Sequence, residues 1–173
     1  MFGYFIPDVI YNNIYDIDFD ALKKNNITGL IFDIDNTLVS YRQETPTKNV
    51  AGLLNKLKSD GFDICFISNN SRERVELFNN EFKYFCFPKA KKPSVKYLKK
   101  ALQAMNIAAE NAAVIGDQLF TDVLAAKRIK ITAILVAPIE PVETVFFKFK
   151  RIMEKPFLKK YYRRVKKNHD KEI

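Results

Sequence analysis

From residue 27 to residue 138, short apolar runs alternate with longer stretches whose apolar residues recur at helical spacing. The apolar runs are typical of buried strands, and the longer stretches are typical of amphipathic helices. Alternation of this kind predicts a parallel sheet with helices on both faces. We therefore expect an α/β fold, a Rossmann-like three-layer sandwich with a central parallel sheet. The expected strands cover residues 27–33, 62–68, 84–87, 112–116 and 131–138.

The first helix after strand 27–33 carries the clearest pattern. Thr45 and Pro46 predict its start, because threonine caps helices and proline suits the first helical position. Four apolar residues then share one face, at spacing i, i+3, i+4 and i+7: Val50, Leu53, Leu54 and Leu57. Gly61 marks the end of the helix before the next strand.

The tripeptide Asp-Ile-Asp occurs twice, at residues 16–18 and 33–35. The second copy ends an apolar run, so its carboxylates lie at the rim of a core, where buried charges need partners. The first copy follows no such strand, and Asp18 or Asp20 is expected to cap a short helix. The second copy is therefore the candidate for chemistry.

Polar residues stand at the carboxyl ends of successive expected strands, where open parallel sheets bind ligands. They are Asp33 and Asp35, Ser68 and Asn69, Lys91 and Lys92 before the next helix, and Asp117 with Asp122 five residues later. Each alone has a structural explanation: Ser68 could begin a turn, Lys92 could be solvated, and Asp117 could cap a helix. Their joint occurrence at one sheet edge favours a site.

The residue types at this edge indicate phosphoryl transfer. Clustered carboxylates suit a hard cation such as Mg²⁺. A hydroxyl and a lysine suit the oxygens of a phosphate. The set as a whole predicts a carboxylate nucleophile that attacks a phosphorylated substrate.

Four motifs, in order, carry a resemblance to a known family: "FDIDNTL", "ISNN", "KKP" and "GDQLFTD". They resemble the motifs of the haloacid dehalogenase superfamily, over residues 33–122. With "KAKKP" and "IGDQLFTDVLAAKR", the chain looks like the YqeG-type phosphatases of subfamily IIIA. That group is related to the phosphatidylglycerophosphate phosphatases, and here the likeness covers nearly the whole chain.

The resemblance implies a role for each residue at the sheet edge. Asp33 would be the nucleophile that forms an aspartyl-phosphate. Asp35 would protonate the leaving alcohol and then deprotonate water, and its main-chain carbonyl would bind the metal. Aspartate at this position argues for a phosphatase, since an acid–base group contributes roughly 10²–10⁴-fold and lets the intermediate turn over.

The resemblance also implies how phosphate and Mg²⁺ would be held. Ser68, Asn69 and Lys92 would bind the phosphate, with Lys91 the alternative to Lys92. Asp33 and Asp35 would bind Mg²⁺ together with Asp117 and Asp122, the last directly, through water, or by orienting the loop.

The spacing between motifs leaves no room for a cap domain. Only a short segment separates Leu38 from the helix expected near Pro46, and residues 68–92 are used by one helix and one short strand. We therefore expect a capless haloacid dehalogenase-like fold with an open site. An open site fits a large substrate, such as a lipid headgroup, a polynucleotide end or a protein.

The C-terminal segment is unlike the rest of the chain. Residues 148–173 carry eleven Lys or Arg and three acidic residues, a net charge of +8, whereas residues 1–147 carry 18 basic and 17 acidic residues. We expect a phosphatase domain over 1–147 and a basic amphipathic tail over 148–173. Pro156 is expected to interrupt the tail helix. Beyond it the apolar face of Phe157, Tyr161 and Val165 fits a helix on anionic lipid, a helix packed on the sheet, or an RNA contact.

These features lead to a functional prediction with alternatives. The first reading is a Mg²⁺-dependent phosphatase of phosphatidylglycerophosphate. The others are a phosphatase of soluble esters or nucleotides, and a basic RNA- or ribosome-associated protein. The N-terminus lacks the positive start of a signal peptide, and Cys65 and Cys86 read as reduced core residues. A cytoplasmic protein, peripheral on the inner face of the membrane, is the expectation.

Overall fold

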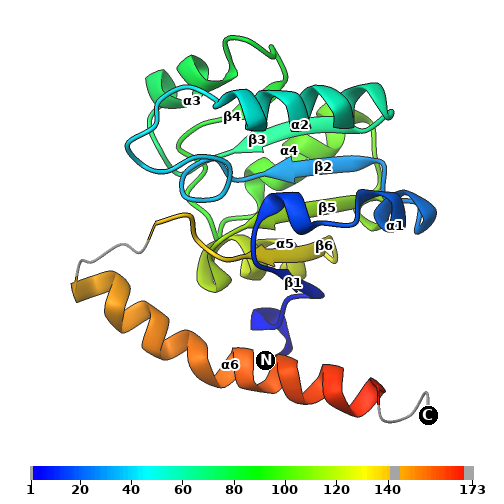
Figure 1. Ribbon diagram of the computed structural model, residues 1–173, viewed down its shortest axis with the longest axis vertical. Coiled ribbons are helices and arrows are strands. Elements are labelled where there is room, and N and C mark those ends of the chain that lie inside the picture. The colour runs from blue at the N-terminus through cyan, green and yellow to red at the C-terminus, as the bar shows by residue number, and fades with distance from the viewer. Residues whose placement is uncertain (1, 141–144, 170–173) are drawn as a thin grey trace.

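The computed structural model describes residues 2–140 and 145–169 and has six parallel strands in one sheet (Figure 1). Their order across the sheet is β1-β6-β5-β2-β3-β4. The strands are β1 (Val9–Tyr11), β2 (Gly29–Phe32), β3 (Asp63–Ile67), β4 (Phe85–Phe87), β5 (Ala112–Gly116) and β6 (Thr132–Val136). The predicted central parallel sheet is confirmed, and β2 lies in its middle, between β3 and β5.

Helical segments connect the strands and cover the sheet. The α-helices are α1 (Phe19–Lys24), α2 (Lys48–Ser59), α3 (Arg72–Asn79), α4 (Lys96–Met105), α5 (Leu124–Arg128) and α6 (Val145–His169). Shorter turns are η1 (Phe2–Phe5), η2 (Ile14–Asp16), η3 (Ala109–Asn111) and the π-helical segment η4 (Leu119–Val123).

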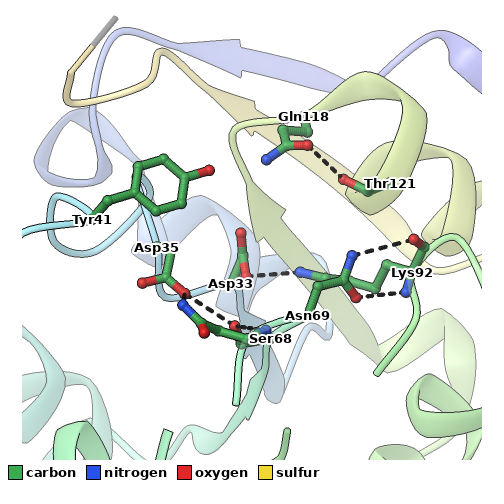
Figure 2. A pocket seen from close by; sticks show the side chains of 9 residues that line it. Asp33, Asp35, Tyr41, Ser68, Asn69, Lys92, Gln118 and Thr121 are labelled. Carbon is green, nitrogen blue, oxygen red and sulfur yellow. Dashed lines mark hydrogen bonds and ion pairs between the residues drawn. The ribbon is translucent and has the colours of Figure 1, made fainter. Parts of the chain in front are cut away.

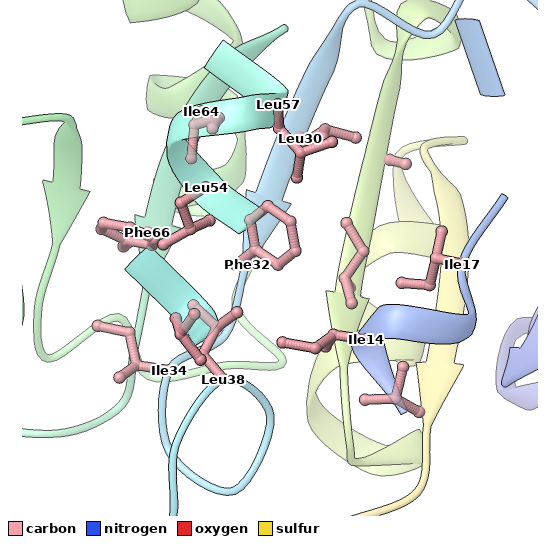
Figure 3. Close-up of a cluster of buried hydrophobic side chains, with 14 of the residues drawn as sticks. Ile14, Ile17, Leu30, Phe32, Ile34, Leu38, Leu54, Leu57, Ile64 and Phe66 are labelled. Carbon is pink, nitrogen blue, oxygen red and sulfur yellow. The ribbon is translucent and has the colours of Figure 1, made fainter. Parts of the chain in front are cut away.

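The core is divided by the sheet, because side chains along a strand alternate between its two faces. On one face Leu30 and Phe32 pack with Leu54 of α2, and Figure 3 shows this cluster. On the other face Ile31 packs in a cluster with Leu98 of α4. The three-layer sandwich follows from strands that are buried on both sides. Both cysteines are free, with Cys65 buried in β3 and Cys86 half-buried in β4.

Two local predictions at the sheet were inaccurate. The helix α2 starts later than expected, because Thr47 rather than Thr45 is its cap and the Thr47 hydroxyl accepts a hydrogen bond from the Val50 amide at 3.3 Å. The strand β1 was not predicted at all, since it has only three residues and pairs with β6 at the sheet edge.

The connections at the carboxyl ends of the central strands are short. Residues 33–47 join β2 to α2 without an inserted helix, and residues 68–95 contain only α3 and β4. The expected capless architecture is therefore confirmed for the described residues.

The C-terminal helix α6 departs from prediction. It continues through Pro156, so the expected interruption there is wrong. Its inner face packs on the sheet domain. The ring centroid of Phe157 lies 4.9 Å from that of Phe5 and 6.0 Å from that of Phe120. The hydroxyl of Tyr161 accepts a hydrogen bond from the Ile10 amide at 3.2 Å. In Figure 1 α6 runs beside the N-terminal segment.

The outer surface of α6 is basic with apolar residues among the cations, since Met153, Tyr162 and Val165 are exposed on it. Val165 therefore does not pack inward with Phe157 and Tyr161. The exposed positions opposite Phe157 and Tyr161 include Ile152, Lys159, Arg163 and Lys166, which recur at helical spacing on one stripe. Within the described part of the chain, no helix has the length and apolarity needed to cross a bilayer.

Candidate active site

The second Asp-Ile-Asp lies at the carboxyl end of the central strand. Asp33 directly follows β2, and its amide donates a hydrogen bond to the carbonyl of Ile115 at 2.9 Å, which continues the pairing with β5. The side chain of Asp33 is buried, and its Oδ1 lies 2.8 Å from Nζ of Lys92. The same ammonium lies 2.6 Å from Oδ1 of Asp122. One lysine thus joins two carboxylates.

The loop before α4 positions this lysine. The Lys92–Pro93 peptide bond is cis. The Asn69 side chain accepts a hydrogen bond from the Lys92 amide at 2.7 Å and donates one to the Lys92 carbonyl at 3.3 Å. Lys92 is buried, whereas Lys91 is exposed. Asn69, which the sequence predicts to bind phosphate, lines the pocket, and Figure 2 shows its amide directed at the Lys92 backbone.

Three buried carboxylates form a cluster that could hold a metal. Asp33, Asp117 and Asp122 each offer an oxygen, and these oxygens all lie within 4.8 Å of one another. A Cβ atom on Gly116 would collide with the Asp122 carboxyl group, so the residue before Asp117 must be glycine for the cluster to form. An all-oxygen donor set suits a hard divalent cation. The side chain of Asp35 does not belong to this cluster.

The charge balance also fits a cation. Burial raises the pKa of Asp33 to about 7, with neighbouring Asp122 and Asp35 adding to the rise and Lys92 opposing it. The carboxylates Asp122 and Asp33 in turn hold the pKa of Lys92 above its ordinary value, despite burial. A bound cation would favour the ionised form of Asp33, which a nucleophile requires.

Asp35 has a different set of partners. Its Oδ1 accepts hydrogen bonds from Nη2 and Nε of Arg74, at 2.9 and 3.1 Å. Its Oδ2 accepts from the Ser68 hydroxyl and the Asn70 side chain, both at 3.2 Å. The two aspartates of the motif are thus separated by environment: Asp33 is paired with lysine, and Asp35 with arginine.

These groups open into a pocket of about 270 Å³. Its lining includes several residues that sequence analysis did not single out as site residues: Tyr41, Asn70, Gln118 and Thr121. Figure 2 shows Tyr41 on the side of the pocket opposite Lys92. Partial desolvation and four nearby carboxylates raise the pKa of the Tyr41 phenol, so it stays neutral and can donate a hydrogen bond.

Neither Tyr41 nor Arg74 could be placed at the site from the sequence. Tyr41 lies in an irregular loop, and Arg74 reads as one charged residue among several in "SRERVELF". The one available signal for Arg74 was its place one turn into the helix that follows Ser68-Asn69-Asn70. Because Arg74 is far from Asp35 along the chain, no local sequence pattern indicates the contact between them.

Comparison with known proteins identifies the family. A haloacid dehalogenase-like hydrolase family model matches residues 40–130. The probable phosphatase YqeG of Bacillus subtilis is 35% identical over 155 residues, 90% of each chain. The chain belongs to the haloacid dehalogenase-like hydrolases. The matched region contains Ser68, Lys92, Asp117 and Asp122 and begins just after Asp35.

A more distant sequence match and a match in fold are also found. The glyceraldehyde 3-phosphate phosphatase of Pyrococcus furiosus is 28% identical over 69% of this chain, and the match spans 48% of that protein's length. A solved structure of the deoxy-D-mannose-octulosonate 8-phosphate phosphatase from Haemophilus influenzae has the same fold. It aligns with a TM-score of 0.54 at 13% identity, over 80% of this chain and 91% of the other.

Proposed function

We propose that this haloacid dehalogenase-type phosphatase hydrolyses a phosphomonoester through an aspartyl-phosphate on Asp33, and that its substrate is the lipid phosphatidylglycerophosphate. One observation carries the catalytic part of the proposal. The Asp33 carboxylate is buried at the head of the pocket, 2.8 Å from a lysine, beside two further carboxylates. This arrangement supplies a nucleophile together with positive charge for the phosphate it attacks.

The reaction has two steps. A carboxylate oxygen of Asp33 attacks phosphorus, the bond from phosphorus to the substrate oxygen breaks, and protonated Asp35 gives its proton to the leaving alkoxide. Asp35, now ionised, takes a proton from water, whose oxygen attacks the phosphorus of the aspartyl-phosphate. Inorganic phosphate leaves, and the Asp33 carboxylate is restored. The sum is hydrolysis of one ester bond by one water molecule.

The remaining residues of the pocket hold the phosphoryl group. Ser68 Oγ and the Lys92 ammonium would donate to its oxygens, and Asn69 would fix the Lys92 backbone that presents the ammonium. Mg²⁺ bound by Asp33, Asp117 and Asp122 would neutralise phosphate charge, and the Asp35 carbonyl is the further ligand expected from the family resemblance. Mg²⁺ is the choice because the donors are oxygens and a phosphate completes them.

Two features support a lipid substrate. The pocket is open, because short connections take the place of a cap. The outer stripe of α6 is basic, and near an anionic surface each Lys or Arg contributes about 1 kcal/mol of binding. Phe157 and Tyr161 pack inward and would not contact the membrane, so the attraction would rest on the basic stripe, with the exposed Tyr162 and Val165 beside it.

A soluble substrate is the second candidate. The relatives in Pyrococcus are named glyceraldehyde 3-phosphate phosphatases, and a pocket of about 270 Å³ admits a small sugar phosphate. In this case α6 would serve only as a structural contact between the C-terminal and N-terminal segments.

Phosphate release separates the two candidates. The full chain is assayed with phosphatidylglycerophosphate in detergent micelles and with a panel of soluble esters that includes glyceraldehyde 3-phosphate, each with Mg²⁺ and with chelator. The lipid proposal expects Mg²⁺-dependent release with the highest kcat/KM on the lipid. A higher kcat/KM on a soluble ester would overturn it and leave the catalytic assignment standing.

Vesicle binding tests the basic stripe separately. The triple variant Lys159→Gln, Arg163→Gln, Lys166→Gln should lose roughly 100-fold in affinity for phosphatidylglycerol vesicles at low salt, from about 1 kcal/mol per charge. The matched control is Lys24→Gln, Lys48→Gln, Lys99→Gln, which removes the same charge from exposed positions elsewhere. Equal losses in both variants would mean that net charge, not the stripe, drives binding. A single-stranded RNA, titrated in parallel, tests the nucleic-acid alternative.

A further inference from the structure

The contact between Arg74 and Asp35 is part of the site but has no role in the reaction as described. Arg74 lies in α3, whose cap Ser71 accepts a hydrogen bond from the Arg74 amide at 3.3 Å. Its guanidinium donates two hydrogen bonds, and both go to the same oxygen, Oδ1 of Asp35. The side chain is only 11% exposed.

The two oxygens of Asp35 are therefore unequal. Oδ1 is held by Arg74, which does not line the pocket, whereas Oδ2 is held by Ser68 and Asn70, which do. Figure 2 shows this second oxygen linked to Ser68. When a phosphate takes the Ser68 hydroxyl, Oδ2 loses a donor and Oδ1 does not. One oxygen is anchored, and the other is the one that can face the substrate.

Stability alone is a poor explanation for this ion pair. Among the described residues, Nη1 of Arg74 is buried and has no hydrogen-bond partner. A buried ion pair with an unsatisfied donor gains little over a well-packed apolar pair, because desolvation offsets the attraction. The exposed ion pair between Arg72 and Glu76, on the same helix, carries no such cost.

We propose that Arg74 is the positioning residue for the acid–base aspartate: it fixes Oδ1 of Asp35 so that Oδ2 points at the leaving oxygen and then at the attacking water. The proposal rests on the acid–base role of Asp35 in the proposed function. Loss of Arg74 should impair the steps in which Asp35 moves a proton, and no others. Acid–base catalysis contributes roughly 10²–10⁴-fold, so the loss caused by mispositioning should be smaller than the loss caused by removing Asp35.

The test compares leaving groups. An alkyl phosphate releases a strongly basic alkoxide that needs a proton, whereas p-nitrophenyl phosphate releases a phenolate that does not. Arg74→Met should lower kcat on glycerol 3-phosphate by about 10- to 100-fold. On p-nitrophenyl phosphate it should leave the rate of the initial p-nitrophenol burst within about threefold and slow the steady state that follows. Arg74→Lys should restore part of both losses.

A double-mutant cycle distinguishes positioning from a structural effect. If Arg74 acts through Asp35, adding Arg74→Met to Asp35→Asn should change the residual rate by less than about twofold. Arg72→Met is the matched control on the same helix and should leave both substrates within about twofold. If Arg74→Met fails to fold in a thermal melt, Arg74→Lys takes its place in the cycle.

These experiments distinguish failure of the positioning role of Arg74 from failure of the acid–base role of Asp35. A loss in the p-nitrophenol burst rate as large as the loss in kcat on glycerol 3-phosphate would overturn the positioning role. An Arg74 loss that is fully retained in the Asp35→Asn background would also overturn it. If Asp35→Asn itself has no effect on either substrate, the acid–base assignment in the proposed function fails, and the positioning role fails with it.

Discussion

The two Asp-Ile-Asp stretches differ in environment rather than in composition. Asp16 and Asp18 are exposed in the N-terminal segment, where Asp18 caps α1 by accepting a hydrogen bond from the Ala21 amide at 2.8 Å. Asp33 and Asp35 are buried at the end of β2. The same three residues therefore serve as a helix cap in one place and as the centre of a site in the other. A buried strand end and its cationic partners make the difference.

The largest expected difference between the stretches is in turnover. Asp33→Asn removes the nucleophile, because an amide does not attack phosphorus, and should lower kcat by at least roughly 10⁴-fold. Asp16→Asn, the matched change in the other stretch, should leave kcat within about threefold. Phosphate release from p-nitrophenyl phosphate measures both, with circular dichroism to verify folding. A large loss in Asp16→Asn together with a small loss in Asp33→Asn would show that the wrong stretch was assigned to chemistry.

The difference between the two Asp-Ile-Asp stretches could be predicted from the sequence because it depends on local patterns. The apolar run before Asp33 predicted a strand, and the acidic residues before a short helical stretch predicted Asp18 or Asp20 as a cap. The structure confirms the strand and shows that Asp18 is the cap. Turn residues and apolar spacing carry this information within a few positions. The order of the strands then brought Ser68, Lys92 and Asp117 to the same edge.

What the sequence did not reveal depends on contacts between distant segments. Arg74 meets Asp35 across 39 positions, and no local pattern marks such a pair. The strand β1 exists because β6 offers it an edge. Pro156 normally breaks a helix at a cost of about 3 kcal/mol, yet α6 continues, and packing of Phe157 and Tyr161 on the N-terminal segment supports it.

The second largest effect on kcat is expected from the loss of the cationic partner of Asp33. Lys92→Met removes the ammonium from Asp33 and Asp122 and should lower kcat by roughly 10²–10³-fold, the range found when one preorganised donor is lost. Lys91→Met is a matched control, since Lys91 is adjacent and exposed, and it should stay within about threefold. A larger loss for Lys91→Met than for Lys92→Met would exchange the roles of the two lysines.

The third difference is in the pH dependence of stability without metal. The pKa of Asp33 is raised to about 7 by burial, so the folded state retains a proton that the unfolded state loses near 3.8. The free energy of unfolding should therefore fall as the pH rises from about 4 to about 7. At higher pH it should stay at this lower level. At pH 8 in chelator, Asp33→Asn should be more stable than the wild type by roughly 1–3 kcal/mol.

The control for this effect is again the first stretch. Asp16→Asn should leave urea midpoints unchanged at pH 5 and at pH 8. Adding Mg²⁺ at pH 8 should stabilise the wild type more than Asp33→Asn, because the carboxylate that binds the cation is missing from the variant. A wild type that is as stable as Asp33→Asn at pH 8 in chelator would mean that Lys92 fully compensates the buried charge.

The smallest expected effect lies in the stretch without chemistry. Asp18→Ala removes the cap of α1 and should lower the free energy of unfolding by about 1 kcal/mol, the usual cost of a lost cap. Asp18→Asn keeps an oxygen acceptor and should lose only a few tenths of that amount. Urea unfolding measures the change, and kcat should stay within about threefold in both variants. A drop in kcat with intact folding would give the first Asp-Ile-Asp a functional role. If stability falls in Asp18→Ala alone and kcat stays constant, the tripeptide by itself carries no chemistry, and its function is set by the strand, the helix and the cations around it.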